Sequence, residues 1–187
     1  MKVKDLTLIA MFAGLIAICS WISIPLPVPF TMQTFGVFAA LLLLGGKRGT
    51  ASVLVYLCLG IIGLPVFSGF NSGLGAIMGP TGGYLAGFAA ICLVYWLGLA
   101  FFGEKPRVMV ISLILGLCLC YLFGSVWFMV VFAQTQGAIT FWAVMLKCVI
   151  PFIIPDLLKL ALAMVIWKRL SPLGFFSPKA AEAKSQP

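Results

Sequence analysis

Long apolar runs alternate with short polar connections along the whole chain. The runs lie at about 6–24, 31–46, 50–64, 82–102, 108–133 and 154–170. A helix rises about 1.5 Å per residue, so about 20 residues span the roughly 30 Å core of a bilayer. The pattern therefore predicts an all-α, polytopic membrane protein with six transmembrane helices. The second and third runs are short, and we expect their helices to be tilted or incomplete.

Two segments near the spans need a separate interpretation. Phe141–Ile150 is largely apolar but too short to span, so we predict a short interfacial helix there. The first run follows Lys2 and Lys4, as a signal peptide would, but it is long enough to span and no small-x-small cleavage site follows it. We therefore predict an uncleaved first helix, a single transmembrane domain over residues 1–176 and a disordered cytoplasmic tail over 177–187.

Composition agrees with this interpretation. Hydrophobic residues make up 63% of the 187 residues and charged residues 9%, against about 25% charged in soluble domains. The net charge of +8 resides mostly in short connections, which favours membrane orientation over nucleic-acid binding. If six helices alternate, ten of the twelve basic residues fall on one side, which predicts a multi-pass protein of the cytoplasmic (inner) membrane with both termini cytoplasmic. The ten are Lys2, Lys4, Lys47, Arg48, Lys105, Arg107, Lys168, Arg169, Lys179 and Lys184.

Several chemistries are excluded by the residues that the chain lacks. It contains no histidine, and its six cysteines have no zinc-ligand spacing, so we expect neither a metal site nor a cofactor. Gly45-Gly46-Lys47-Arg48 is a basic connection and not a phosphate-binding loop, and no such motif occurs elsewhere. The chain therefore has no ATPase motif of its own, and an enzymatic activity is not expected.

One acid stands deep in an apolar run. Asp156 is followed three residues later by Lys159, and residues three apart on a helix point to the same side. A charge at membrane depth costs roughly 2.5–3.5 kcal/mol on insertion scales, so such residues tend to face a cavity or each other. The pair predicts a small-molecule site, in which Asp156 accepts N–H groups and Lys159 binds a carboxylate. The alternative is a structural ion pair, with Asp156 after Pro155 at the helix N-terminus.

The connections on the predicted external side are nearly uncharged and rich in proline, glycine and aromatics. Eight glycines lie in the segment from Gly60 to Gly83, both included, and irregular backbone at membrane depth requires burial or a cavity. Asn71, the single asparagine, and Gln33 offer donors and acceptors to a polar ligand, and the alternatives are a turn role and satisfaction of nearby backbone groups. Tyr84 and nearby aromatics are expected to wall a pocket or to form an interfacial belt. These aromatics are Phe30, Phe67, Phe70, Trp127 and Phe152.

Small residues form stripes on the first predicted helix. Ala10 and Gly14 are four residues apart, as are Ala13 and Ala17, which allows another helix to approach closely. The partner is either another helix of this chain or a separate membrane subunit.

Four separated stretches together resemble the BioY family, the biotin-specific substrate-binding (S) components of energy-coupling factor transporters. They are Pro27–Thr34, Gly63–Phe67, Gly79–Leu85 and Pro151–Lys159. The resemblance implies six helices and high-affinity capture of biotin near the outer face. It also implies docking through the first helix, where Ala13 and Ala17 match an Ala-x-x-x-Ala stripe, against a membrane coupling subunit driven by two ATPase subunits.

The resemblance also assigns residues. Asp156 and Lys159 match the ligand-binding acid and base of the family. Asn71 and Tyr84 match polar and aromatic positions around its pocket. The chain departs at Leu85, where some relatives have arginine, and at Pro155, where glycine is frequent. Lys159 is then the one obvious cation for the carboxylate of biotin.

Two other functions remain as alternatives at this point. A secondary carrier for a small amphipathic acid or another vitamin would use Asp156 as a proton or sodium site. A small membrane enzyme has few catalytic options, with one buried acid and no histidine.

Overall fold

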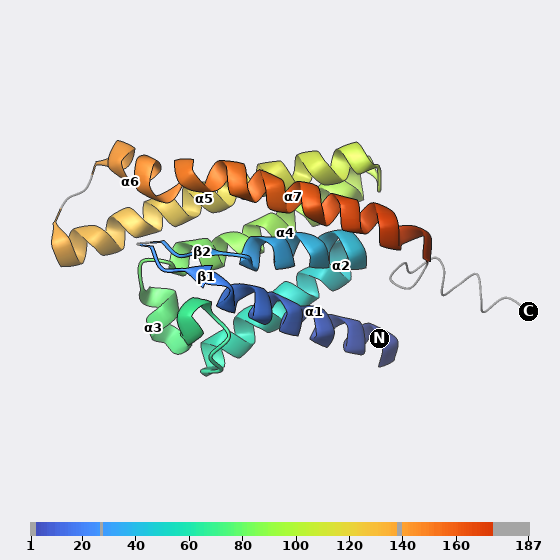
Figure 1. Ribbon diagram of the computed structural model, residues 1–187, viewed down its shortest axis with the longest axis horizontal. Helices are drawn as coiled ribbons and strands as arrows, with labels where there is room; N and C mark the ends of the chain where they lie inside the picture. The colour runs from blue at the N-terminus through green and yellow to red at the C-terminus, as the bar shows by residue number, and fades with distance from the viewer. Residues whose placement is uncertain (1–2, 27, 138–139, 174–187) are drawn as a thin grey trace, which may run out of the picture.

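A computed structural model describes residues 3–26, 28–137 and 140–173, which form a helical bundle with a small β-hairpin at one end (Figure 1). The helices are α1 (Val3–Trp21), α2 (Gln33–Ile62), α3 (Gly73–Met78), α4 (Gly82–Phe102), α5 (Pro106–Gln136), α6 (Phe141–Cys148) and α7 (Ile150–Leu170). Two 3-10 turns, η1 (Ser68–Phe70) and η2 (Ser171–Leu173), and two antiparallel strands, β1 (Ser23–Ile24) and β2 (Phe30–Thr31), complete the described part. The all-α class is confirmed.

Helix α2 contains both the second and the third predicted run, and it folds back on itself at Gly45. The backbone there is non-helical, with φ 76° and ψ 176°. A Cβ at Gly49 would lie 2.7 Å from the Cα of Leu41, whereas eight residues of straight helix cover about 12 Å. The two arms run in opposite directions in Figure 1, the first in light blue and the second in cyan.

Five described helices are long and apolar enough to cross a membrane when α2 is counted once. With α2 divided at Gly45, the six apolar runs correspond to six helical rods. The first arm, from Gln33 to Leu44, is about 18 Å long, which agrees with the expected incomplete helix. The number of crossings stays a prediction.

The end of α1 and the start of α7 differ from the predicted runs. Helix α1 ends at Trp21, because Ser23–Ile24 pairs instead with Phe30–Thr31. Helix α7 begins at Ile150, so Pro151 occupies its first turn and Pro155 lies inside the helix. The predicted short helix at 141–150 is present as α6. Its place at the membrane interface stays a prediction, and the predicted tail at 177–187 lies outside the described residues.

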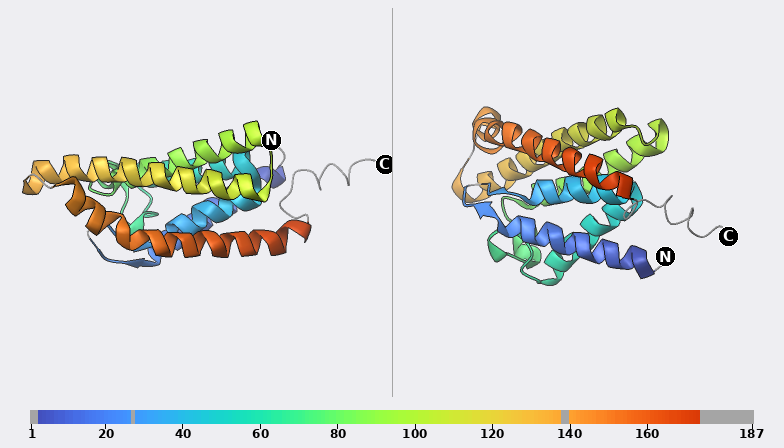
Figure 2. Two further views of the ribbon diagram at one scale, coloured as in Figure 1. Left: turned by 90° about the horizontal axis from the view of Figure 1, so that it is seen from above. Right: turned by 45° about the vertical axis from the view of Figure 1, so that its right-hand side comes forward.

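Glycine allows α4 and α5 to pack closely along their length. A Cβ at Gly87 of α4 would lie 2.6 Å from the Sγ of Cys120, and one at Gly116 of α5 would lie 2.8 Å from the Cα of Ile91. Small residues at such contacts are the usual means by which membrane helices pack. The two helices run side by side in both views of Figure 2.

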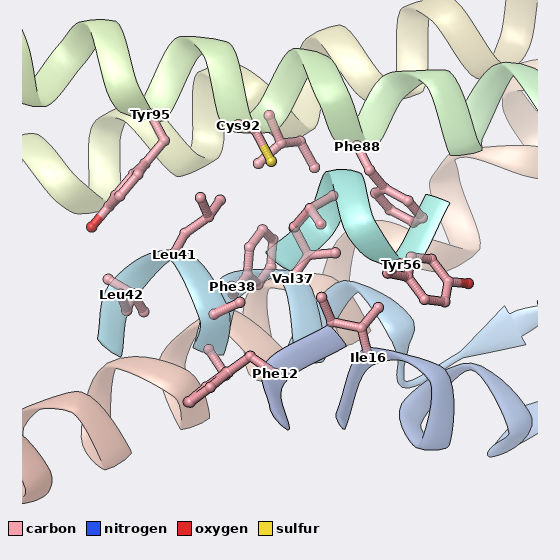
Figure 3. Packing of buried hydrophobic residues seen from close by; sticks show 14 of the residues in the cluster. Phe12, Ile16, Val37, Phe38, Leu41, Leu42, Tyr56, Phe88, Cys92 and Tyr95 are labelled. Carbon is pink, nitrogen blue, oxygen red and sulfur yellow. The ribbon is translucent and has the colours of Figure 1, made fainter. Parts of the chain in front are cut away.

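The main core lies where α1, both arms of α2 and α4 meet. Figure 3 shows Ile16 of α1, Val37 and Phe38 of α2, and Phe88 of α4 directed into it. A smaller cluster joins α5, α6 and α7 at the opposite end from the N-terminus. Its buried members are Val28, Phe128, Val144, Cys148 and Phe152. The two cores hold the rods on either side of a space at the hairpin end of the bundle.

The basic connections gather at one end of the bundle. The start of α1, the break in α2, the α4–α5 connection and the end of α7 all lie at the right of Figure 1. The hairpin, α3 and α6 lie at the left. This arrangement agrees with the predicted alternation of the rods, while the cytoplasmic placement of the basic end stays a prediction.

Candidate functional site

A cavity of about 520 Å³ lies at the hairpin end of the bundle. Its volume is within the roughly 300–1,000 Å³ of pockets that hold small molecules. The five residues that the sequence singled out for ligand binding all line it. They are Gln33, Asn71, Tyr84, Asp156 and Lys159. The fold thus brings together positions from α2, the η1–α3 segment, α4 and α7.

Asp156 and Lys159 form a buried ion pair in the second and third turns of α7. The Nζ of Lys159 lies 2.8 Å from the Oδ1 of Asp156, and the two residues are 5% and 3% exposed. The hydroxyl of Tyr121 on α5 donates to the Oδ2 of Asp156 at 2.6 Å. Each oxygen of the carboxylate therefore has a donor, as a buried charge requires.

Lys159 connects α7 to the hairpin. Its ammonium group donates to the carbonyl oxygen of Thr31 at 2.6 Å and lies 4.2 Å from the centre of the Phe30 ring. An ammonium group has three donors and a carboxylate about four acceptor positions. In the described part of the chain, Lys159 uses two of its donors, to Thr31 and Asp156, and Asp156 uses two of its acceptor positions, for Lys159 and Tyr121. One N–H group and about two acceptor positions of the pair therefore have no hydrogen-bond partner among the described residues.

The explanation of Asp156 as a residue of the first helical turn is wrong. The unpaired N–H groups of a helix are those of its first turn. Because α7 begins at Ile150, Asp156 lies beyond that turn. The ion pair with Lys159, the other part of that alternative, is present. Pro155 cannot donate to the carbonyl of Pro151, so the helix lacks one backbone hydrogen bond next to the acid.

The other three predicted residues differ in how firmly they are held. Gln33 is buried and donates from Nε2 to the hydroxyl of Tyr56 at 2.7 Å. The hydroxyl of Tyr84 donates to the carbonyl of Cys148 on α6 at 3.3 Å. Asn71 is exposed and donates to the carbonyl of Ser68 at 2.8 Å, so its turn role is confirmed alongside its place at the cavity.

The predicted aromatic wall is only partly present. Phe67 and Phe152 line the cavity, and Phe30 packs against Phe152 at a centroid distance of 6.0 Å. Phe70 instead stacks on Trp21, and Trp127 donates from its indole nitrogen to the carbonyl of Gly79. Aliphatic residues complete the apolar wall, among them Leu85, where the chain departs from the arginine of some relatives. The others are Leu26, Val28 and Leu117.

Three residues at the site were missed by sequence reasoning. Tyr121 was detectable, since it is one of four tyrosines and lies in an otherwise apolar run. Tyr56 supports Gln33 across 23 positions of sequence, a pairing that only the fold-back of α2 creates. Thr31 acts through its backbone carbonyl, for which the sequence carries no signal.

The small-residue stripes of α1 face two directions. Ala13 and Ala17 are 2% and 6% exposed and belong to the main core, so packing within this chain accounts for them. Ala10 and Gly14 are exposed, and a Cβ at Gly14 would have no atom within 4 Å outside its own turn. A partner that packs against α1 as the structure has it would therefore contact Ala10 and Gly14.

The fold and the site together define a polytopic α-helical membrane protein with a ligand cavity built around a buried ion pair. The model of the BioY family matches residues 1–174. The chain belongs to this family.

Similar proteins match over almost the whole length. The probable biotin transporter BioY of Pyrococcus horikoshii is 39% identical over 171 residues, which are 91% of this chain and 98% of the relative. The biotin transporter BioY of Thermotoga maritima is 40% identical over 171 residues, 91% of this chain and 97% of the relative. The crystal structure of the S-component for biotin from an ECF-type ABC transporter has a TM-score of 0.77 and 31% identity, over 91% of this chain and 92% of that one.

Proposed function

We propose that this chain captures biotin with high affinity and is the substrate-binding subunit of an ATP-driven vitamin transporter in the cytoplasmic membrane. The observation that carries the proposal is the cavity around Asp156 and Lys159, in a chain whose relatives are named biotin transporters. A buried ion pair is weak evidence for stability, because apolar residues of similar volume are often as stable. A pair with unused hydrogen-bonding capacity inside a cavity is suited to a polar ligand.

The chemistry of biotin matches the distribution of polar groups. Its ureido ring offers N–H donors and a carbonyl acceptor, its thiophane ring and chain are apolar, and its carboxylate is anionic. Asp156 accepts from the ureido N–H groups, and the amide of Asn71 contacts the same ring. Phe67, Phe152 and Leu117 surround the apolar part.

Lys159 neutralises the carboxylate in this proposal. Among the described residues that line the cavity, it is the one cation. Its remaining N–H group forms the contact while Asp156 and Thr31 hold the ammonium group in place. Gln33 and the hairpin then lie beside the ligand, and Tyr84 borders it from α4.

Release requires a partner in this proposal, since no ATPase motif is present in the sequence. The partner is a membrane coupling subunit with two ATPase subunits, and it packs on the exposed Ala10–Gly14 stripe of α1. We expect Gly14→Leu to prevent co-purification with the coupling subunit and to leave biotin binding unchanged. Loss of binding without loss of co-purification would contradict this assignment.

A secondary carrier with Asp156 as a proton or sodium site fits the geometry less well. The ammonium group of Lys159 at 2.8 Å already compensates the carboxylate, so the pair is neutral overall and attracts a second cation only weakly.

Titration calorimetry on the purified chain tests the proposal. We expect one biotin bound per chain, weaker binding of biotinamide, which lacks the carboxylate, and no binding of riboflavin. A folded wild-type chain that does not bind biotin would refute the assignment. Equal affinity for biotin and biotinamide would refute the role of Lys159 alone.

A further inference from the structure

A short turn over residues 65–71 borders the cavity between α2 and α3. Phe67, Ser68 and Asn71 of this turn line the cavity. The N–H of Phe67 donates to the carbonyl of Asn71 at 3.1 Å, and the side chain of Asn71 donates to the carbonyl of Ser68. The turn is thus internally closed, and Phe67, which is 3% exposed and packs edge-on against Tyr56 at 5.6 Å, anchors one end of it in the main core. The position of the remaining part, residues 68–71, depends on contacts from outside the turn.

The C-terminal end of α1 holds this turn by three side-chain contacts. The indole N–H of Trp21 donates to the carbonyl of Pro65 at 2.9 Å, and the hydroxyl of Ser20 donates to the carbonyl of Val66 at 2.5 Å. The ring of Trp21 stacks on that of Phe70, with centroids 5.1 Å apart and planes at 26°. Two aromatic rings and two hydrogen bonds therefore join segments that are more than 40 positions apart in the sequence.

Phe70 is held in a conformation that its side chain disfavours. Its φ of 58° is the one positive value at a non-glycine residue in the described part of the chain. A bulky residue in the left-handed region is strained and stays there only where its surroundings impose it. The residue is 63% exposed, so burial in a core does not impose it. The stack on Trp21 is the ring contact that the structure shows for this side chain, and the hydrogen bond from the N–H of Phe67 to the carbonyl of Asn71 spans the same residue.

The same end of α1 leads directly into the β1–β2 hairpin, which also borders the cavity through Thr31. The N–H of Met32 donates to the carbonyl of Ile22, and Ser23 pairs with Thr31 in the hairpin. Thr31 in turn accepts the hydrogen bond from Lys159. A movement of this helix end would therefore displace the turn through Trp21 and the hairpin through the backbone.

We propose that Trp21 is a positioning residue, which holds the strained 65–71 turn over the cavity and thereby sets how fast the ligand leaves. When the Trp21–Phe70 stack separates, Phe70 relaxes to a negative φ and residues 68–71 move away from the cavity, while Phe67 stays packed against Tyr56. The ligand class, biotin, rests on the proposed function, whereas the mechanical link between α1 and the turn does not.

The first test measures the dissociation rate of biotin from the purified chain. We expect Trp21→Ala to raise it about tenfold with little change in the association rate, because most affinity changes within one complex appear in dissociation. Trp21→Phe keeps a ring but not the N–H group, and we expect it to raise the rate only about threefold, in line with loss of one hydrogen bond. Trp142→Ala, an exposed tryptophan on α6, is the matched control and should match wild type.

A second measurement needs no biotin. Hydrogen–deuterium exchange of amides 64–72 should be faster in Trp21→Ala than in wild type and Trp142→Ala, with exchange in the α4–α5 pair unchanged. If wild type binds no biotin, the proposed function fails while this measurement still decides the link. Unchanged exchange of the turn in Trp21→Ala would overturn the proposal, as would faster exchange spread evenly over the whole chain.

Discussion

Two acid–base pairs occupy cavities at opposite ends of this protein, and they differ in solvent access. The side chains of Asp156 and Lys159 are 5% and 6% exposed, with their charged atoms 2.8 Å apart. Arg48 and Asp5, which join the break in α2 to the start of α1, are 18% and 25% exposed and 3.3 Å apart. The second pair lines a cavity of about 620 Å³, which is larger than that around Asp156.

Chemistry and not volume distinguishes the candidate site around Asp156 from the larger cavity around Arg48. Water reaches the Arg48–Asp5 pair, so separating it costs little. The Asp156–Lys159 pair must have its desolvation offset by protein groups, and Tyr121 and Thr31 supply them. A site maintained at such cost and still able to accept further hydrogen bonds is the better candidate for recognition.

Removal of one buried charge should have the largest effect. Lys159→Met leaves the carboxylate of Asp156 buried without its cation, which should lower the free energy of unfolding by about 3–5 kcal/mol. We expect no measurable biotin binding by calorimetry. Lys147→Met, at an exposed position on α6, is the control and should leave both quantities unchanged. If Lys159→Met binds biotin as tightly as wild type, the Asp156–Lys159 pair is no more important for binding than the Arg48–Asp5 pair.

Loss of the tyrosine that supports the carboxylate should have the next largest effect. Tyr121→Phe removes a hydrogen bond to a charged acceptor, worth about 1.5–3 kcal/mol, so biotin should bind roughly 10- to 100-fold more weakly. Tyr95→Phe is the matched control, because the buried hydroxyl of Tyr95 has no hydrogen-bond partner among the described residues. If the two variants bind biotin equally well, Tyr121 does not support the site.

Replacement of the ring beside the ammonium group should have a moderate effect. Phe30→Leu keeps an apolar side chain but removes the interaction between the ring and Lys159, worth about 0.5–2 kcal/mol. We expect biotin affinity to fall between about 2-fold and 30-fold. Phe123→Leu, at an exposed position on α5, should bind as wild type does. If biotin affinity falls equally in Phe30→Leu and Phe123→Leu, the loss of any aromatic ring weakens binding and the contact between Phe30 and Lys159 has no specific role.

The exposed pair should have the smallest effect. Arg48→Ala should change the free energy of unfolding by at most about 1 kcal/mol, because solvent screens the pair. The dissociation constant for biotin should not change. Thermal melting and calorimetry on the same preparation check both statements. Loss of biotin binding in Arg48→Ala would show that binding depends on a charge at the end of the molecule opposite the Asp156–Lys159 pair. That result would contradict the difference drawn between the two pairs.

The helices and the polar site residues were predictable from the sequence. The run at 82–102 matches α4 at both ends, because glycines and a charged connection delimit it. Gln33, Asn71, Asp156 and Lys159 stood out because polar residues are few in such a chain, and all four line the cavity. Polar identity together with the family resemblance thus indicated most of the polar lining of the cavity.

The directions that helices face were not predictable. Helix α1 is apolar on all sides, so its pattern does not show which stripe meets protein and which meets lipid. Ala13 and Ala17 consequently turn inward, whereas the sequence left both directions open. The fold-back at Gly45 and the carbonyl of Thr31 depend on backbone conformation, which a hydropathy pattern does not encode.

The most direct test neutralises both members of the buried pair at once. The double variant Asp156→Asn with Lys159→Met leaves no unpaired charge and keeps an acceptor for Tyr121, so we expect it to melt cooperatively near the wild-type temperature. Calorimetry with biotin then separates recognition from stability. We predict a folded protein that does not bind biotin. A folded double variant with wild-type affinity would show that the pair is structural and does not bind the ligand.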